Sequence, residues 1–279
     1  MAPKQRLMAL ANGISLEVTD ASVREPPVGI IVLLHGFPQT AYQFRHVIGP
    51  FTDAGQPQAS PSPSWEKTSS NSWTPSKSGQ RSHLVGHDFG GMIAWYIATR
   101  HPDRLETVNW GECTLLGTVK RRKRFINPDA PEALIAGREE IFLSYFFDKY
   151  AFNPSAIAPK DLDHYVKVYS KPGAIRCALE LRRAFSADYG ENHEWLSNHP
   201  KCRVPTIGMF GEKSIVCSHE QAVVMFAMVH EEMTYELVTV PDAGHYLAEE
   251  NPEAFVDMTL AHIRRHQPHI NGFHVEVED

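Results

Sequence analysis

The stretch Gly86-His87-Asp88-Phe89-Gly90-Gly91 decides the fold of this chain. A short apolar run, 82–85, precedes it, and a helix-like pattern, 92–98, follows it. The motif therefore lies on a strand-to-helix turn, with glycines where the backbone bends sharply. A residue at the apex of such a turn, here Asp88, is strained and exposed, which is the geometry of a nucleophile elbow. The competing interpretation is an ordinary glycine-rich turn with an exposed Asp, and the rest of the chain must decide.

Apolar runs alternate with helical patterns on both sides of this turn. The run Gly29–Leu34 is continuously apolar, as in a strand buried on both faces. Strands are also predicted at 7–11 and 13–20 (a hairpin joined at Asn12-Gly13), 82–86, 106–110, 204–210 and 235–240, which we take as the last strand. Helices are predicted up to about Asp53 and at 90–101, 217–230 and 251–266, the last with Asn251 as its cap and Pro252 at its first position.

This alternation predicts an α/β fold, a mostly parallel sheet flanked by helices. Residues 115–200 are helical and charged, and they separate two of the predicted strands. We therefore predict an inserted helical cap at 115–200 on a core made of residues 1–114 and 201–279.

Residues 55–81 do not fit this pattern. Serine and proline dominate them, and the segment offers neither a strand nor an amphipathic helix. With suitable codons, Trp65 to Ser78 can be read one nucleotide upstream as an amphipathic helix. We therefore hypothesise that this segment is out of frame, and genomic sequence lacking those codons would contradict the hypothesis.

The composition narrows the class of protein. The chain has 279 residues with 42% hydrophobic residues and a net charge of −6, which is typical of a soluble globular protein and gives no reason to expect a nucleic-acid partner. No apolar run is long enough to cross a membrane. Four cysteines lack metal-ligand spacing, so we expect free thiols, a cytoplasmic location and no metal site.

A histidine and an acid are expected beside Asp88. His245 follows the strand 235–240, and the carboxyl ends of parallel strands share one edge of a sheet, so Asp88 and His245 should meet there. A histidine base needs an acid to hold its tautomer. Glu112 follows the strand next to the nucleophile strand and is our choice, while Glu212 is the reserve.

Two backbone N–H groups are predicted to stabilise the oxyanion of an ester intermediate. Phe89 follows the nucleophile and supplies one donor, and Phe37, in the loop after His35-Gly36, supplies the other. Pro38 should hold that loop rigid.

Together these residues resemble the α/β-hydrolase family, in its epoxide hydrolase and haloalkane dehalogenase branch. The matching motifs are His35-Gly36-Phe37-Pro38, the Asp88 turn, Asp242-Ala243-Gly244-His245 and the cap segment 131–139. The resemblance implies that Asp88 attacks an epoxide carbon to give an ester, which His245, oriented by Glu112, hydrolyses to a vicinal diol. It implies a small-molecule substrate and no cofactor. The predicted substrate pocket comprises His35, Pro38, His87, Trp110, Tyr145 and Tyr169.

The chain departs from this family pattern in ways that keep alternatives open. Family members carry a further strand between the His-Gly loop and the elbow, and Arg182 stands where the resemblance implies a cap tyrosine that protonates the leaving oxygen. A haloalkane or haloacid dehalogenase of the same fold is one alternative, although Phe89 and Phe37 replace the Trp and Asn favoured there. A catalytically impaired relic, lacking a core strand and cap donors, is the other.

Overall fold

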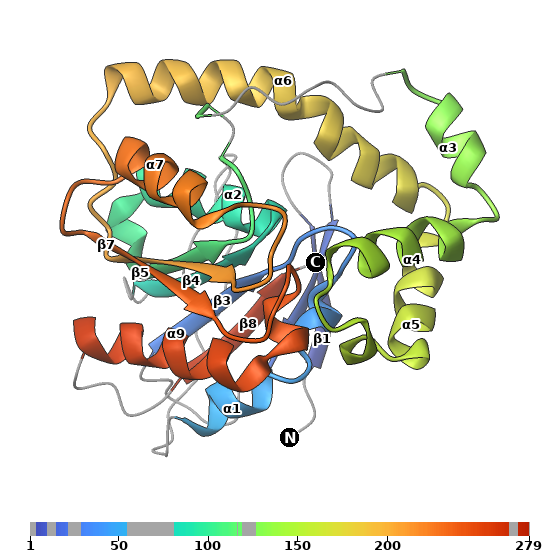
Figure 1. Ribbon diagram of the computed structural model, residues 1–279, viewed down its shortest axis with the longest axis horizontal. Coiled ribbons are helices and arrows are strands. Elements are labelled where there is room, and N and C mark those ends of the chain that lie inside the picture. The colour runs from blue at the N-terminus through green and yellow to red at the C-terminus, as the bar shows by residue number, and fades with distance from the viewer. Residues whose placement is uncertain are drawn as a thin grey trace.

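The computed structural model describes residues 4–9, 15–21, 29–54, 81–115, 117–118, 127–267 and 273–278. Figure 1 shows a twisted sheet with helices on its two faces and a further group of helices to the right of the sheet and along the top of the molecule. This arrangement confirms the predicted α/β fold. The Asn12-Gly13 turn and residues 55–80 lie outside the described residues, so the frame hypothesis for Trp65 to Ser78 stays a hypothesis.

Within the described residues the sheet has eight strands in the order β1-β2-β8-β3-β4-β5-β6-β7. The strands from β3 to β7 are parallel to their neighbours, and β1 pairs with β2 in an antiparallel hairpin as predicted. Every residue of β3 is buried, because a parallel strand is covered on both faces. The bounds are β1 Lys4–Ala9, β2 Ser15–Asp20, β3 Gly29–Leu34, β4 Ser82–His87, β5 Leu105–Gly111, β6 Thr206–Gly211, β7 Tyr235–Val240 and β8 Phe273–Glu278.

The prediction that 235–240 is the last strand is wrong. Strand β8 follows it in sequence and lies inside the sheet, parallel to β3 (Gly29 opposite Phe273) and antiparallel to β2 (Thr19 opposite Val277). The Val277 side chain is fully buried. The alternation of apolar and charged or polar residues in Phe273-His274-Val275-Glu276-Val277-Glu278 is a strand signal that the sequence did contain.

Two helices cover each face of the sheet. Helices α1 (Ile48–Asp53) and α9 (Pro252–His266) pack on one face, where Phe51 and Phe255 enter the core. Helices α2 (Phe89–Arg100) and α7 (His219–Val229) pack on the other, with Trp95 and Phe226. Figure 1 shows this layering, with α1 and α9 below the sheet and α2 and α7 above it.

The start of α9 agrees with the sequence. Asn251 caps the helix by accepting a hydrogen bond from the Ala254 N–H at 3.1 Å, and Pro252 occupies the first position. A short helix, α8 (Leu247–Glu250), precedes it. Single 3₁₀ turns complete the core and the neighbouring loops at η1 Ala41–Phe44, η2 Pro102–Arg104 and η3 Pro154–Ala156.

Among the described residues, four helices separate β5 from β6 in the chain and lie beyond the sheet (Figure 1). They are α3 Ala130–Ile135, α4 Glu139–Tyr150, α5 Pro159–Tyr169 and α6 Ala174–Asn198. Their apolar side chains form a third cluster with Phe37, Phe89 and Tyr246 of the core, so these helices cover the sheet edge that carries the elbow. The exact bounds of the cap, 115–200, stay a prediction. None of the helices that the structure describes has the length and apolarity needed to cross a bilayer.

Candidate active site

Asp88 lies between the end of β4 and the start of α2, as the sequence predicts for the apex of the turn. Its backbone has φ 51° and ψ −115°, a conformation that costs free energy in a residue with a side chain. The turn is tight on both sides. A Cβ on Gly36 would lie 2.4 Å from the Asp88 Cβ, and a Cβ on Gly90 would lie 2.2 Å from the Leu34 carbonyl oxygen. Both positions must therefore be glycine if Asp88 is to keep its strained backbone conformation and present its carboxylate at the apex of the turn.

The Asp88 carboxylate faces the backbone of the His-Gly loop. The Phe37 N–H donates to Asp88 Oδ2 at 3.1 Å. Phe89 is the first residue of α2, and the first N–H groups of a helix have no acceptor within the helix. The two predicted oxyanion donors therefore belong to segments that flank Asp88.

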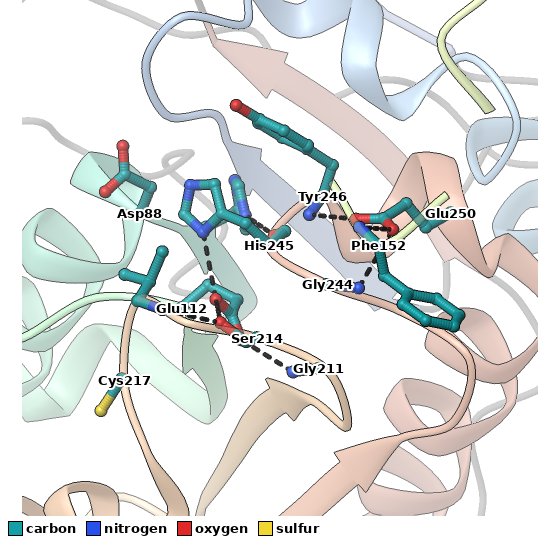
Figure 2. Close-up of polar contacts among 12 residues, drawn as sticks. Asp88, Glu112, Phe152, Gly211, Ser214, Cys217, Gly244, His245, Tyr246 and Glu250 are labelled. Atoms are coloured by element: carbon teal, nitrogen blue, oxygen red, sulfur yellow. Dashed lines mark hydrogen bonds and ion pairs between the residues drawn. The ribbon is translucent and has the colours of Figure 1, made fainter. Parts of the chain in front are cut away.

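His245 and Glu112 meet at the edge where Asp88 lies. His245 Nδ1 lies 3.0 Å from Glu112 Oε2, and both residues are buried. Figure 2 shows the imidazole between Glu112 and Asp88, with its second nitrogen on the Asp88 side. Glu112 also accepts hydrogen bonds from the Gly211 N–H at 2.7 Å and the Ser214 hydroxyl at 2.6 Å. Glu212 instead forms an exposed ion pair with Lys213.

Burial and the neighbouring polar groups shift the pKa values of His245 and Glu112 in opposite directions. Burial alone lowers the pKa of His245, but the hydrogen bond that His245 donates to Glu112 and the charge of Asp88 outweigh it and raise that pKa above its ordinary value. Burial raises the pKa of Glu112, while His245 and Ser214 oppose the shift. The arrangement therefore favours an imidazole that gains a proton readily, which a general base requires.

The loop that carries His245 is fixed by a second acid, Glu250. Its carboxylate accepts from the N–H groups on both sides of His245, those of Gly244 at 3.1 Å and Tyr246 at 2.9 Å. It also accepts from Phe152 at 2.7 Å and Asn153 at 2.8 Å, beyond the end of α4 (Figure 2). Glu250 thus ties the histidine loop to the helices above it, a role that the sequence did not suggest.

The predicted pocket residues divide into two groups. His87, Tyr169, His35 and Pro38 lie around the elbow. His87 Nε2 lies 2.7 Å from the His245 carbonyl oxygen, and the Tyr169 ring lies 5.6 Å from that of Phe37. His35 accepts the Gly90 N–H on its carbonyl at 3.0 Å, and Pro38 follows Phe37 in the same loop.

Trp110 and Tyr145 are corrections, because the structure does not bring them to the pocket. Successive residues of a strand face opposite sides of the sheet, and Trp110 faces α7, where its ring stacks on Phe226 at 4.1 Å. Tyr145 is 56% exposed on α4, and its hydroxyl accepts a hydrogen bond from Lys149 at 3.0 Å.

Tyr246 and Arg182 are the side chains that the pocket prediction omitted. The Tyr246 ring packs edge-on to His245 at 4.9 Å, and its buried hydroxyl has no hydrogen-bond partner among the described residues. The Arg182 guanidinium lies over the rings of Phe37 and Phe89. The sequence could have indicated Tyr246 as a pocket residue, because it directly follows His245 in the chain. Within the described part of the chain, no group of three or more His, Cys, Asp or Glu side chains could hold a metal ion.

Comparison with known proteins agrees with this fold. A model described as "Alpha/beta hydrolase family" matches residues 31–258. A soluble epoxide hydrolase of Corynebacterium sp. (strain C12) is 25% identical, over 90% of this chain and 94% of its own. A haloalkane dehalogenase of Agrobacterium fabrum (strain C58 / ATCC 33970) is 26% identical, over 57% of this chain and 59% of its own. The crystal structure of wild-type Cfl2 from Burkholderia cenocepacia has a TM-score of 0.77 at 21% identity, covering 95% of this chain and 97% of that one.

The family match begins in β3 and ends in α9, so it includes the His-Gly loop, the elbow, the cap helices and the histidine loop. The likeness to Cfl2 shows the fold, and the match to the soluble epoxide hydrolase extends over nearly the whole of both chains. On these grounds, and with the resemblance to its epoxide hydrolase branch, the chain belongs to the alpha/beta hydrolase family.

Proposed function

We propose that this hydrolase opens epoxides to vicinal diols through an ester on Asp88. One observation carries the proposal. A strained carboxylate at the apex of the elbow lies beside a buried histidine, and a buried glutamate orients that histidine from its far side. The name of the Corynebacterium relative supports the choice of substrate class.

In the first step an Asp88 oxygen attacks an epoxide carbon, and the bond from that carbon to the ring oxygen breaks. The leaving oxygen needs a proton. Tyr246 is our candidate, because its buried hydroxyl has no hydrogen-bond partner among the described residues and its ring lies beside His245. Burial holds the pKa of this hydroxyl well above the ordinary value, so the hydroxyl is protonated at neutral pH. The Asp88 charge also raises this pKa, and ester formation removes that charge as the proton leaves.

In the second step His245 takes a proton from water, and the resulting hydroxide attacks the Asp88 carboxyl carbon. The Phe37 and Phe89 N–H groups stabilise the oxyanion. The bond from the Asp88 carboxyl carbon to the substrate oxygen then breaks, the hydroxyl proton of the tetrahedral intermediate leaves with the diol, and Asp88 is again a carboxylate. The imidazolium, whose ring lies 4.9 Å from that of Tyr246, returns its proton to the tyrosine. The net reaction converts one epoxide and one water into one diol.

The substrate in this proposal is a small molecule. The cytoplasmic location of the protein stays a prediction.

Two alternatives remain as outcomes of the test. Displacement of a halide by Asp88 is favoured by the name of the Agrobacterium relative. The other alternative is an impaired relic that lacks a core strand. Strand β8 argues against it, because β8 lies between β2 and β3 and the described sheet is continuous from β1 to β7.

The test is the intact mass of the His245→Ala variant after incubation with epoxides and alkyl halides. Without its base, the variant should accumulate the ester, with a mass gain equal to one epoxide that maps to Asp88. A gain equal to an alkyl group without its halogen would establish the dehalogenase instead. Absence of any adduct, in a variant that melts cooperatively and with Asp88→Asn as the blank, would contradict both activities.

A further inference from the structure

The loop that carries His245 is held from two sides, and one of these sides belongs to the cap. On the core side, His87 Nε2 donates to the His245 carbonyl oxygen at 2.7 Å. On the cap side, the His245 N–H donates to the carbonyl oxygen of Tyr150 at 3.0 Å, and Tyr150 is the last residue of α4. The position of the base therefore depends on where the end of a cap helix lies.

A single carboxylate, that of Glu250, joins the same two segments. It accepts four backbone N–H groups, two of which flank His245 while two follow α4 in the chain: those of Gly244, Tyr246, Phe152 and Asn153. Figure 2 shows the carboxylate bonded to the backbone of both segments. The bond from Tyr246 goes to Oε1 and the other three go to Oε2, so both oxygens are used. An amide of the same shape would turn N–H donors toward at least one of these N–H groups.

Helix α4 contacts the elbow as well as the histidine loop. Phe146 lies one turn before the end of this helix, and its ring meets that of Phe37 edge-on at 5.1 Å. The Phe37 N–H in turn donates to the Asp88 carboxylate. One helix of 12 residues thus touches the His-Gly loop through a side chain and the histidine loop through its last residue. A change in the seating of α4 over the elbow therefore moves the loop that carries His245.

Asp88 and His245 act in different steps of the proposed reaction. Asp88 makes the bond to the substrate, and His245 activates the water that hydrolyses the ester. A displacement of a catalytic group by about 1 Å can lower a rate by roughly 100-fold. We propose that Glu250 is a positioning residue for hydrolysis of the ester, which aims His245 only while the end of α4 is seated against the histidine loop. This role rests on the proposed function only for the Asp88 ester, which an alkyl halide also forms.

Rapid-quench mass spectrometry measures ester formation and ester hydrolysis separately in Glu250→Gln. The probe is the epoxide that gives the largest adduct on His245→Ala. We expect hydrolysis to slow by about 10- to 100-fold. Ester formation should stay within about twofold, so the ester accumulates and kcat and KM fall together. Glu253→Gln is the matched control, because it makes the same change in an exposed acid at the start of α9, and both rates should stay within about twofold.

Gly244→Ala tests position without removing the charge of Glu250. Burial lowers the pKa of His245 while the neighbouring acids, Glu250 among them, raise it, so Glu250→Gln also alters the strength of the base. A Cβ on Gly244 would lie 2.5 Å from the Phe152 nitrogen and 2.7 Å from the Tyr150 carbonyl oxygen, and it therefore forces the two segments apart. We expect the same selective loss of hydrolysis in this variant.

A spectroscopic measurement separates this role from the proposed function. The Nδ1 proton that His245 donates to Glu112 should give a downfield proton resonance, identified by its loss in His245→Ala, and observing it requires no substrate. We expect it to shift in Glu250→Gln and Gly244→Ala but not in Glu253→Gln. If no compound forms the ester but the resonance shifts as expected, the proposed function fails and the coupling of His245 to the cap stands. An unshifted resonance, hydrolysis at the wild-type rate, or equal losses in both steps in a folded Glu250→Gln variant would overturn the positioning role.

Discussion

Glu112 and Glu249 are both buried carboxylates, but they face different partners. Glu112 bonds to His245, a base that gains and loses a proton. Glu249 bonds to the Arg45 guanidinium, the Gln39 amide and the Tyr165 hydroxyl of cap helix α5. Burial raises the pKa of both acids, while their partners lower it. Arg45 also pairs with Asp161 of α5 at 3.2 Å, so this second cluster joins the core to the cap.

The difference separates chemistry from assembly. A buried acid beside a titratable base stabilises that base when it takes up a proton during a reaction. A buried acid beside a guanidinium has no such role, because the guanidinium stays charged throughout. We therefore expect Glu112 to control turnover and Glu249 to control the stability with which the cap sits on the core.

The largest expected effect is that of Glu112→Gln on turnover. The amide should favour the wrong imidazole tautomer, and in a triad of this kind the loss in kcat is about 10⁴-fold. Steady-state rates on a reactive epoxide measure it, with the unfolding midpoint as a check on folding. Glu212→Gln, in the exposed pair with Lys213, is the control and should stay within about twofold. Equal losses in the two variants would break the comparison.

Glu249→Gln should act on stability instead. Its side chain is fully buried and that of Arg45 is 15% exposed, so the change leaves a largely buried cation whose only anionic partner among the described residues is Asp161. Breaking a buried pair costs about 3 kcal/mol, which denaturant unfolding measures. Glu231→Gln removes a surface partner of Arg203 and should cost less than about 1 kcal/mol. A Glu249→Gln variant as stable as wild type would show that the cluster does not hold the cap.

The pH dependence should follow His245 alone. Its pKa lies above the ordinary value of 6.5, and the neutral ring is the base that hydrolyses the ester, so kcat should rise with pH as His245 loses its proton. Removing the Glu112 carboxylate lowers the pKa, which nuclear magnetic resonance titration of the histidines in Glu112→Gln should detect. The stability supplied by a raised histidine pKa is present at low pH and lost as pH rises through it. A pKa of His245 that is unchanged in Glu112→Gln would contradict the assigned cause.

The smallest effect is expected from Tyr165→Phe. The ring stays in the cap cluster, and only the hydroxyl that donates to Glu249 at 3.1 Å is lost. One hydrogen bond to a charged group is worth about 2 kcal/mol, and Glu249 keeps Arg45 and Gln39, so a loss near 1 kcal/mol should appear in denaturant unfolding. Turnover should not change. A large loss of turnover would mean that the cap cluster also takes part in the chemistry.

The sequence predicted the parts of the molecule that local pattern controls. The continuous apolar run Gly29–Leu34 is a buried parallel strand, as its pattern predicted, and the glycines around Asp88 lie at a tight strand-to-helix turn. Placing Glu112 and His245 beside it followed from the shared edge of parallel strands. The structure brings the two together at 3.0 Å.

The remaining features depend on contacts between segments far apart in the chain. The side of the sheet that Trp110 faces depends on the exact phase of β5, and the exposure of Tyr145 depends on how α4 packs. Strand β8 pairs with the edge of β3 that offers unpaired backbone N–H and C=O groups. The strand propensity of residues 273–278 does not indicate which strand they will pair with. Glu250 collects N–H groups from two loops that lie about 100 residues apart in sequence, near 150 and near 245.

The position of β8 has a consequence for biosynthesis. Asp88, Glu112 and His245 are all translated before residues 273–278, yet β8 is the strand that joins the β1–β2 hairpin to β3. Until β8 has emerged from the ribosome, β3 presents an open edge, and such edges invite pairing with other chains. Nascent chains stalled before residue 273 should therefore be cut quickly by protease, and chains that include β8 slowly. Completion of the hydrolase fold is in this sense timed by residues that take no part in its chemistry.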